Sequence, residues 1–166
     1  MKKSLFLKLS FFLLVVCAKV NAQQNNPPFT LLETGYGIYT SHTVANEDIA
    51  GSTSIGHAVV EKQVLVKKTD KVPAKIGVQF GTIYKLTGKD RDTVSLEIEW
   101  IYPHEIMDTS KNAKYASIRY PIKLPVNFEN SRTYSLDDNF EVVKGLWVLN
   151  IYSDNKIIFT RKFDLY

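Results

Sequence analysis

Residues 145–152 read Gly-Leu-Trp-Val-Leu-Asn-Ile-Tyr, residues 153–156 read Ser-Asp-Asn-Lys, and residues 157–165 read Ile-Ile-Phe-Thr-Arg-Lys-Phe-Asp-Leu. The first segment is apolar at neighbouring positions, as in a central strand that is buried on both faces. The second has the composition of a tight turn. The third places Ile157, Phe159, Phe163 and Leu165 at every second or fourth position, which indicates a strand with one buried face. Together they predict an antiparallel β-hairpin at the end of the chain.

The same period of two continues upstream of this hairpin. It is clear in 94–102, where Val94, Leu96, Ile98, Trp100 and Tyr102 alternate with polar residues, and it recurs in 118–124 and 76–86. Less regular strand candidates are Phe29–Thr40, Ala58–Lys67 and Thr133–Val142, and we find no helical period. About seven to eight strands separated by turn residues predict an all-β protein, an immunoglobulin-like antiparallel β-sandwich. We expect Trp100 and Trp147 at the centre of its core.

The amino terminus has the organisation of a cleavable signal peptide. Lys2 and Lys3 precede an apolar run, and Val20-Asn21-Ala22 presents small residues to a signal peptidase. A membrane anchor would need about 20 apolar residues, but Lys8 and Lys19 interrupt this run. A lipid anchor at Cys17 is disfavoured because Val16 stands where a small residue is usual. We therefore predict a signal peptide at 1–22, a flexible spacer at 23–28 and a single β-sandwich domain at 29–166, exported to the periplasm or secreted, with no membrane insertion after cleavage.

Signal cleavage changes the charge of the protein. The full chain carries +4, but four of its 21 basic residues lie in the signal peptide, which leaves 17 basic and 17 acidic residues. A formally neutral domain does not predict a nucleic-acid partner. The single cysteine is removed as well, so the mature domain is expected to depend on its apolar core without disulfide bonds.

Several glycine-aromatic segments resemble an uncharacterised bacterial family. They are Gly35-Tyr36-Gly37-Ile38-Tyr39, the stretch 72–81, Tyr84-Lys85-Leu86-Thr87-Gly88, and the closing Gly145-Leu146-Trp147 and Phe159–Phe163. Together they are similar to domain of unknown function 3859 over about Gly35 to Leu165. The resemblance implies one exported domain; it implies no activity, cofactor or catalytic residue.

One string comes near to a zinc-protease motif. His104-Glu105-Ile106-Met107-Asp108 matches the pattern HExxH except for its last residue. The motif depends on two imidazoles one helical turn apart, and no apolar period supports a helix here. We predict a surface connection between strands, with no metal or cofactor and no catalytic residue.

Two other features suggest surfaces. Glu97 and Glu99 lie two apart on a predicted strand and therefore share a face, which we expect to be solvated. The tyrosines 36, 39, 115, 134 and 152 could either form a sugar-stacking platform or be half-buried.

The longest stretch without strand or helix period is Thr40–Gly56. Structureless connections of more than about 12–15 residues are usually functional or disordered. We predict that this loop, with His42 and His57 at its edges, makes the main partner contact, with the candidates His42, Asn46, Glu47, Asp48 and His57. The alternative is an insertion without a role.

The sequence thus predicts an exported non-enzymatic module that binds an unidentified envelope protein or glycan. An envelope-directed hydrolase and a purely structural domain remain as alternatives.

Overall fold

The computed structural model describes residues 29–47, 57–89 and 93–166, and within these ranges gives the backbone alone for 42–47 and 57–62. Nine strands and one short 3-10 helix form in these residues. The strands are β1 (Phe29–Glu47), β2 (His57–Lys67), β3 (Lys71–Val72), β4 (Gln79–Gly88), β5 (Thr93–Asp108), β6 (Ala113–Pro125), β7 (Glu129–Ser135), β8 (Gly145–Ser153) and β9 (Lys156–Leu165); the helix η1 spans Asn139–Glu141. None of the described residues forms a helix long and apolar enough to cross a membrane.

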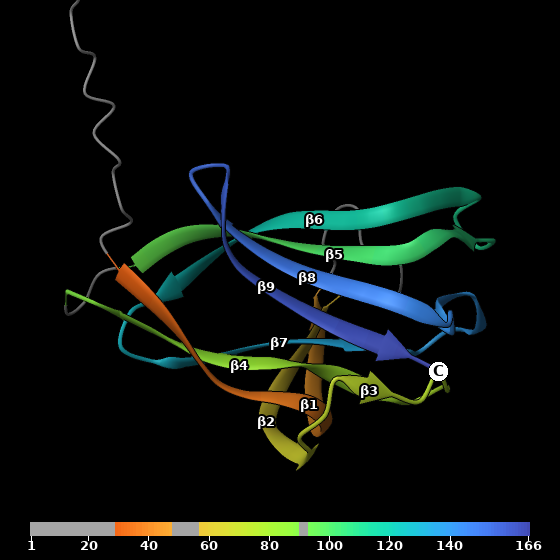
Figure 1. The fold of residues 1–166 in the computed structure, drawn as a ribbon, viewed down its shortest axis with the longest axis horizontal. Coiled ribbons are helices and arrows are strands. Elements are labelled where there is room, and N and C mark those ends of the chain that lie inside the picture. The colour runs from red at the N-terminus through yellow and green to blue at the C-terminus, as the bar shows by residue number, and fades with distance from the viewer. Residues whose placement is uncertain (1–28, 48–56, 90–92) are drawn as a thin grey trace, which may run out of the picture.

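The strands form two sheets that pack face to face (Figure 1). One has four strands in the order β2-β1-β4-β7, and the other has five in the order β3-β9-β8-β5-β6. All pairings are antiparallel except that of the two-residue β3 with β9. The predicted β-sandwich is confirmed.

The core lies between the sheets and is centred on aromatic rings. Trp147 and Trp100 are 0% and 1% exposed, and each packs edge to face with Phe80 at 5.6 Å between ring centroids. The indole Nε1–H of Trp147 donates to the carbonyl oxygen of Val143 at 3.0 Å, so the polar atom of the ring is satisfied. Both tryptophans therefore occupy the central positions that the alternation predicted.

The carboxyl-terminal hairpin forms as expected. β8 pairs with β9 on one side and with β5 on the other, so it is a central strand, and the predicted turn at Ser153–Lys156 connects β8 to β9. A register shift between Ile151 and Tyr152 interrupts the alternation of β9. As a result Ile157 is 55% exposed, although the sequence placed it on the buried face.

Two predicted strand boundaries were wrong: the start of the strand expected at 76–86 and the end of the strand expected at 133–142. The strand β4 begins at Gln79, because residues 76–77 form a turn in which Gly77 donates to the carbonyl of Leu136 at 2.8 Å. The strand β7 ends at Ser135, and Asp138 begins η1 with a capping box to Glu141. In both cases a local turn replaces the end of the expected strand.

The largest error concerns Thr40–Gly56, which is not one long loop. β1 continues to Glu47, and its distal half pairs with β2 from Ile38↔Lys67 to Glu47↔His57. Residues 48–56 lie outside the described residues. The segment Thr40–Glu47 is a strand because long-range backbone pairing supplies its hydrogen bonds, and the sequence shows no apolar period that would reveal this pairing.

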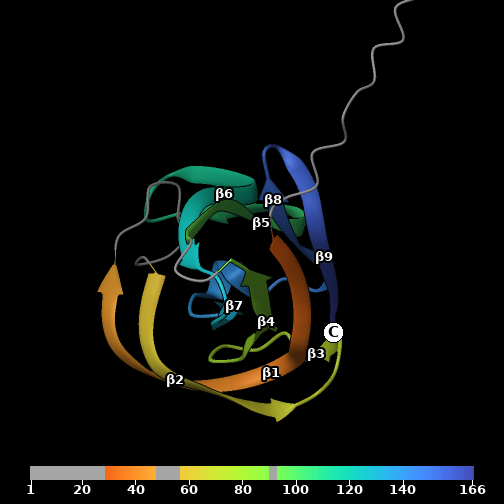
Figure 2. The ribbon, with the colours of Figure 1, turned by 90° about the vertical axis from the view of Figure 1, so that its left-hand side faces the viewer.

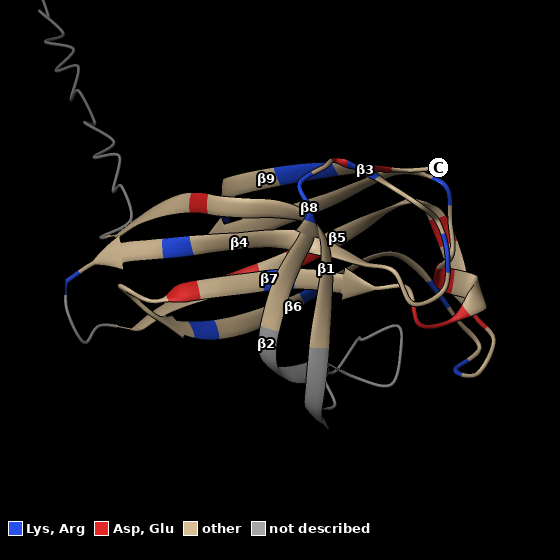
Figure 3. Cartoon of the chain, turned by 90° about the horizontal axis from the view of Figure 1, so that it is seen from below, with Lys and Arg blue, Asp and Glu red and all other residues tan. Residues whose placement is uncertain are grey.

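The β1–β2 hairpin curves round the sandwich and crosses the outer face of β4 and β7 (Figures 2 and 3). Where the two strands of the hairpin begin to pair, Gly37 has a φ of 139°, and a Cβ atom there would lie 2.0 Å from the carbonyl oxygen of Lys67. Only glycine combines that dihedral angle with such a close approach. Gln63 of the hairpin donates to Thr133 of β7 at 2.7 Å, which holds the hairpin against the sheet.

Candidate functional site

The outer face of the five-stranded sheet carries the most extensive polar network among the described residues. On β5, Leu96, Ile98 and Trp100 are buried, and the alternate residues Glu97 and Glu99 point to solvent. The prediction that both carboxylates share the outer face is confirmed. Neighbouring strands place partners beside them, because Glu97 lies opposite Tyr152 and Glu99 lies between Arg119 and Asn150 in the register.

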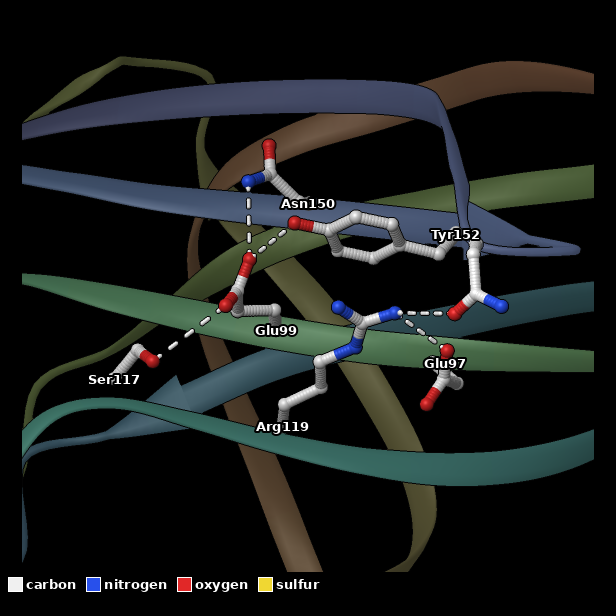
Figure 4. Close-up of polar contacts among 7 residues, drawn as sticks. Glu97, Glu99, Ser117, Arg119, Asn150 and Tyr152 are labelled. Carbon is white, nitrogen blue, oxygen red and sulfur yellow. Dashed lines mark hydrogen bonds and ion pairs between the residues drawn. The ribbon is translucent and has the colours of Figure 1, made fainter.

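Glu99 is the acceptor at the centre of this network (Figure 4). The Tyr152 hydroxyl donates to Glu99 Oε2 at 2.5 Å and the Asn150 amide donates to the same oxygen at 3.3 Å. Ser117 donates to Oε1 at 3.5 Å. The hydrogen bond that the Tyr152 hydroxyl donates to Glu99 is the largest cause of the raised pKa of Tyr152. One carboxylate thus orients side chains from both neighbouring strands.

Arg119 connects this group to Glu97. Its Nη2 donates to Glu97 Oε2 at 2.6 Å and to Asn155 Oδ1 at 3.5 Å. Its guanidinium carbon lies 3.9 Å from the centre of the Tyr152 ring, within the range of a cation–π contact. The hydrogen bond to Glu97 is the largest cause that raises the pKa of Arg119. Arg119 is therefore held over an aromatic ring by a carboxylate beside it.

Apolar side chains surround this polar group on the same face. Ile101 and Val148 are half-buried opposite one another. Leu146 and Ile157 are 49% and 55% exposed. A face that mixes exposed aliphatic side chains with an ordered tyrosine and arginine has the composition of a protein contact surface. We call Glu97, Glu99, Arg119, Asn150 and Tyr152 the β5 face cluster.

The arrangement suits binding more than bond cleavage. The two carboxylates stand side by side on one strand, whereas glycoside hydrolysis needs two that face each other across the scissile bond. Both are also engaged by donors from the chain, so neither is presented as a free base.

Comparison with protein families gives one match. The sequence profile of domain of unknown function 3859 (DUF3859) matches residues 30–165. The chain belongs to this family. The residues that suggested the resemblance all lie inside the matched range, and the family description assigns no activity.

A solved structure shares the DUF3859 chain's architecture. It is the crystal structure of an immunoglobulin-like protein from Pseudomonas aeruginosa, with a TM-score of 0.59 and 22% sequence identity, covering 85% of this chain and 94% of that chain. The similarity supports the immunoglobulin-like fold. No curated protein matches the chain.

Four of the five contact residues that the sequence suggested belong to β1 and β2. The backbones of His42, Asn46 and Glu47 belong to β1, and His57 begins β2. The register brings Glu47 and His57 together as direct partners and places His42 further along, opposite Lys62. The side chains of these residues, and Asp48 as a whole, lie outside the described residues, so their role as contacts stays a prediction.

The string His104–Asp108 does not form the expected surface connection. It belongs to the end of β5, where the pairing with β6 shifts register between Ile101 and Ile106. His104 and Glu105 are exposed, while Asp108 is buried and accepts hydrogen bonds from Ser110 and Lys111. In the described part of the chain no three His, Cys, Asp or Glu residues lie close enough together to hold a metal ion.

The tyrosines do not form a common platform. Tyr39 and Tyr134 are buried. The rings of Tyr36 and Tyr152 are each covered by an arginine, at 4.0 Å from Arg161 and 3.9 Å from Arg119. Of the two alternatives, buried or half-buried tyrosines therefore fit the structure better than a sugar-stacking platform.

Sequence reasoning found the two glutamates of the β5 face cluster and missed its other members. Arg119 lies within the alternating segment 118–124 and received no role of its own, and Tyr152 was considered only as one tyrosine among several. The signal that could have joined them is the order of the sheet, because β6 and β8 flank β5. That order involves strands far apart in the chain, and no local pattern contains it.

Proposed function

We propose that this domain is an exported, non-enzymatic binding module that contacts a protein of the cell envelope through the β5 face cluster. The observation that carries the proposal is the stacking of Arg119 on Tyr152, held in place by Glu97 and Glu99. Arginine and tyrosine are the residue types that most often supply binding energy at protein interfaces. The order of basic, apolar and small residues in 1–22 supports export.

The number of hydrogen bonds within the cluster strengthens this argument. An exposed ion pair such as Glu97–Arg119 contributes at most about 1 kcal/mol to stability, so stability alone gives little reason for so ordered a group. Pre-ordered side chains lose less conformational entropy when a partner binds. Glu99, Arg119 and Tyr152 also come from the three adjacent strands β5, β6 and β8, which hold them more precisely than a loop would.

A protein partner fits this face better than a glycan. Sugar recognition commonly uses an aromatic ring whose face is open to the sugar, and here Arg119 covers one face of the Tyr152 ring. The exposed Leu146 and Ile157 offer aliphatic contact area on the same side of the sheet. Aliphatic area beside polar anchors matches the mixed composition of transient protein interfaces.

The test is affinity capture with the protein beginning at Gln23, from an envelope extract of the parent cells. Arg119→Ala should abolish capture of the specific partner, and Tyr152→Phe should weaken it, because Phe keeps the ring and loses the hydrogen bond to Glu99. Lys85→Ala, an exposed change on the other sheet, is the matched control. Thermal unfolding should show that all variants remain folded.

A parallel pair of variants tests the hairpin residues that the sequence suggested. If Asn46→Ala and Glu47→Ala abolish capture while Arg119→Ala leaves it intact, the contact surface is the β1–β2 hairpin and the β5 face cluster is not the site. A partner that is captured equally by every variant would contradict both assignments.

A further inference from the structure

Among the described side chains, one arginine that points into the sandwich, Arg132, has no carboxylate partner. Arg132 lies on β7 directly opposite Thr82 of β4, and Thr82 is completely buried between the sheets. Because direct cross-strand partners point to the same face, Arg132 also points inward. It is half-buried, at the side of the sandwich where β7 and β6 are the edge strands.

Two tyrosines converge on this position. Tyr84, next but one to Thr82 on β4, is 0% exposed and lies diagonally across from Arg132 on the inner face. Tyr120, on β6 of the facing sheet, is 5% exposed. Burial raises the pKa of Tyr120 to about 12 and also raises that of Tyr84, and in both cases the charge of Arg132 opposes the increase. The positive charge of Arg132 therefore acts on both phenols.

Arg132 and Tyr84 each carry a buried hydrogen-bond donor without an acceptor among the described residues. Arg132 Nη1 donates to the carbonyl oxygen of Ser131 at 2.5 Å, but its Nε is buried and has no hydrogen-bond partner. The hydroxyl of Tyr84 is also buried without a partner. In the described ranges the two ion pairs are Glu97–Arg119 and Glu33–Arg161, so Arg132 belongs to neither.

A second inward arginine, Arg161, shows which partners a buried guanidinium has elsewhere between the sheets. Arg161, from β9, also points between the sheets, and Glu33 accepts hydrogen bonds from both its Nε and its Nη2. The hydroxyl of Thr82 donates to the same carboxylate at 2.7 Å. Arg161 is therefore neutralised by a carboxylate that also accepts from a hydroxyl, whereas Arg132 has the Tyr84 hydroxyl on its own face and no carboxylate among the side chains that the structure describes.

We propose that Arg132 and Tyr84 form an anion-binding site between the β7 and β6 edges, and that its ligand is a carboxylate group. A guanidinium fork matches the two oxygens of a carboxylate, and a phenol hydroxyl supplies a further donor. An anion would give the buried Nε–H and O–H the acceptors that the described residues do not supply, and an unpaired buried donor is costly. The site lies between the sheets and is independent of the β5 face cluster.

The test is a titration of the protein beginning at Gln23 with sodium acetate and, separately, with sodium phosphate, at constant pH and ionic strength. The Nε–H resonance of Arg132 is followed by NMR. We expect saturable binding of acetate with a dissociation constant on the order of millimolar, equivalent to about −4 kcal/mol. Arg132→Gln should remove saturation, and Tyr84→Phe should weaken binding about tenfold, or about 1.4 kcal/mol.

The controls separate this site from a general salt effect and from misfolding. Lys85→Ala, next to Tyr84 on the opposite face of β4, should bind acetate like the unmodified protein. Because Arg132→Gln could alter the edge of the sandwich, Tyr84→Phe provides a nearly isosteric second variant. In both variants, acetate binding to the folded protein is followed through the backbone amides of β7.

Three results would overturn the proposal. They are a linear, unsaturable response to acetate, saturation that persists in both Arg132→Gln and Tyr84→Phe, and saturable binding of phosphate without binding of acetate. The last result would assign the site to a different anion.

Discussion

Arg161 and Glu33 join the two sheets through an ion pair between residues 128 positions apart in the chain. The guanidinium donates from Nε to Glu33 Oε1 at 2.9 Å and from Nη2 to Oε2, and it also stacks on Tyr36. The side chains keep 26% and 17% of their surface exposed. The pair lies on the inner face, because Arg161 is opposite the buried Leu149 and Glu33 is opposite the buried Tyr84.

Because of this ion pair, we expect removal of one partner to lower the free energy of unfolding more than replacement of both partners. Glu33→Gln should lower the free energy of unfolding by roughly 2–3 kcal/mol, below the 3–5 kcal/mol typical of fully buried pairs because both side chains keep some exposure. The double variant Glu33→Leu/Arg161→Met should recover most of this loss, since it leaves no uncompensated charge. Urea denaturation of the two variants measures the difference. A double variant that is less stable than Glu33→Gln would contradict this account.

Trp147 predicts the largest loss of stability from a single truncation. Its ring is fully buried and contacts Phe80, Tyr102 and Tyr134, so Trp147→Ala should cost about 3–5 kcal/mol through the cavity that it leaves. The neighbouring Leu146 is 49% exposed, and Leu146→Ala should change stability by less than about 0.5 kcal/mol. Similar denaturation midpoints for the two variants would show that the core is not centred on Trp147.

Asp108 predicts a dependence of stability on pH. The hydroxyl of Ser110 donates to its Oδ1 at 2.6 Å, and this is the largest cause that lowers the pKa of Asp108 from its ordinary value of 3.8. A depressed pKa in the folded state stabilises the protein above the ordinary value, and the contribution is lost as pH falls through the folded pKa. Asp108→Asn should therefore be less stable than the unmodified protein at pH 7, by on the order of 1–3 kcal/mol for hydrogen bonds to a charged group.

The difference between the unmodified protein and Asp108→Asn should shrink as pH falls below about 4. Denaturation at pH 7 and at pH 3 measures it. Asp164→Asn, an exposed change on β9, is the control for charge removal. A difference that stays constant between the two pH values would show that Asp108 acts through packing and not through its charge.

Export predicts a defined amino terminus. If residues 1–22 are removed by a signal peptidase, the protein recovered from the envelope begins at Gln23. Intact-mass measurement should show this species alone. A lipid adduct at Cys17, or the full precursor retained in membranes, would contradict the prediction.

The sequence by itself determined which parts of the chain form most of the strands and which residues enter the core. A period of two assigns each side chain of β5 to one face, so Trp100 could be placed inside and Glu97 and Glu99 outside. The turn chemistry of residues 153–156 defined the last hairpin. These features depend on neighbours in the chain, and a linear pattern can therefore reveal them.

Only the tertiary structure decided how the strands meet. Thr40–Glu47 carries no alternation, and it became a strand because β2 supplies its backbone partners. Arg119 reaches Tyr152 because β6 and β8 flank β5, and Arg132 approaches Tyr84 and Tyr120 because β7 pairs with β4 while β6 lies in the opposite sheet. Such contacts arise from pairings between distant segments, whose order depends on the packing of the whole domain and not on any local periodicity.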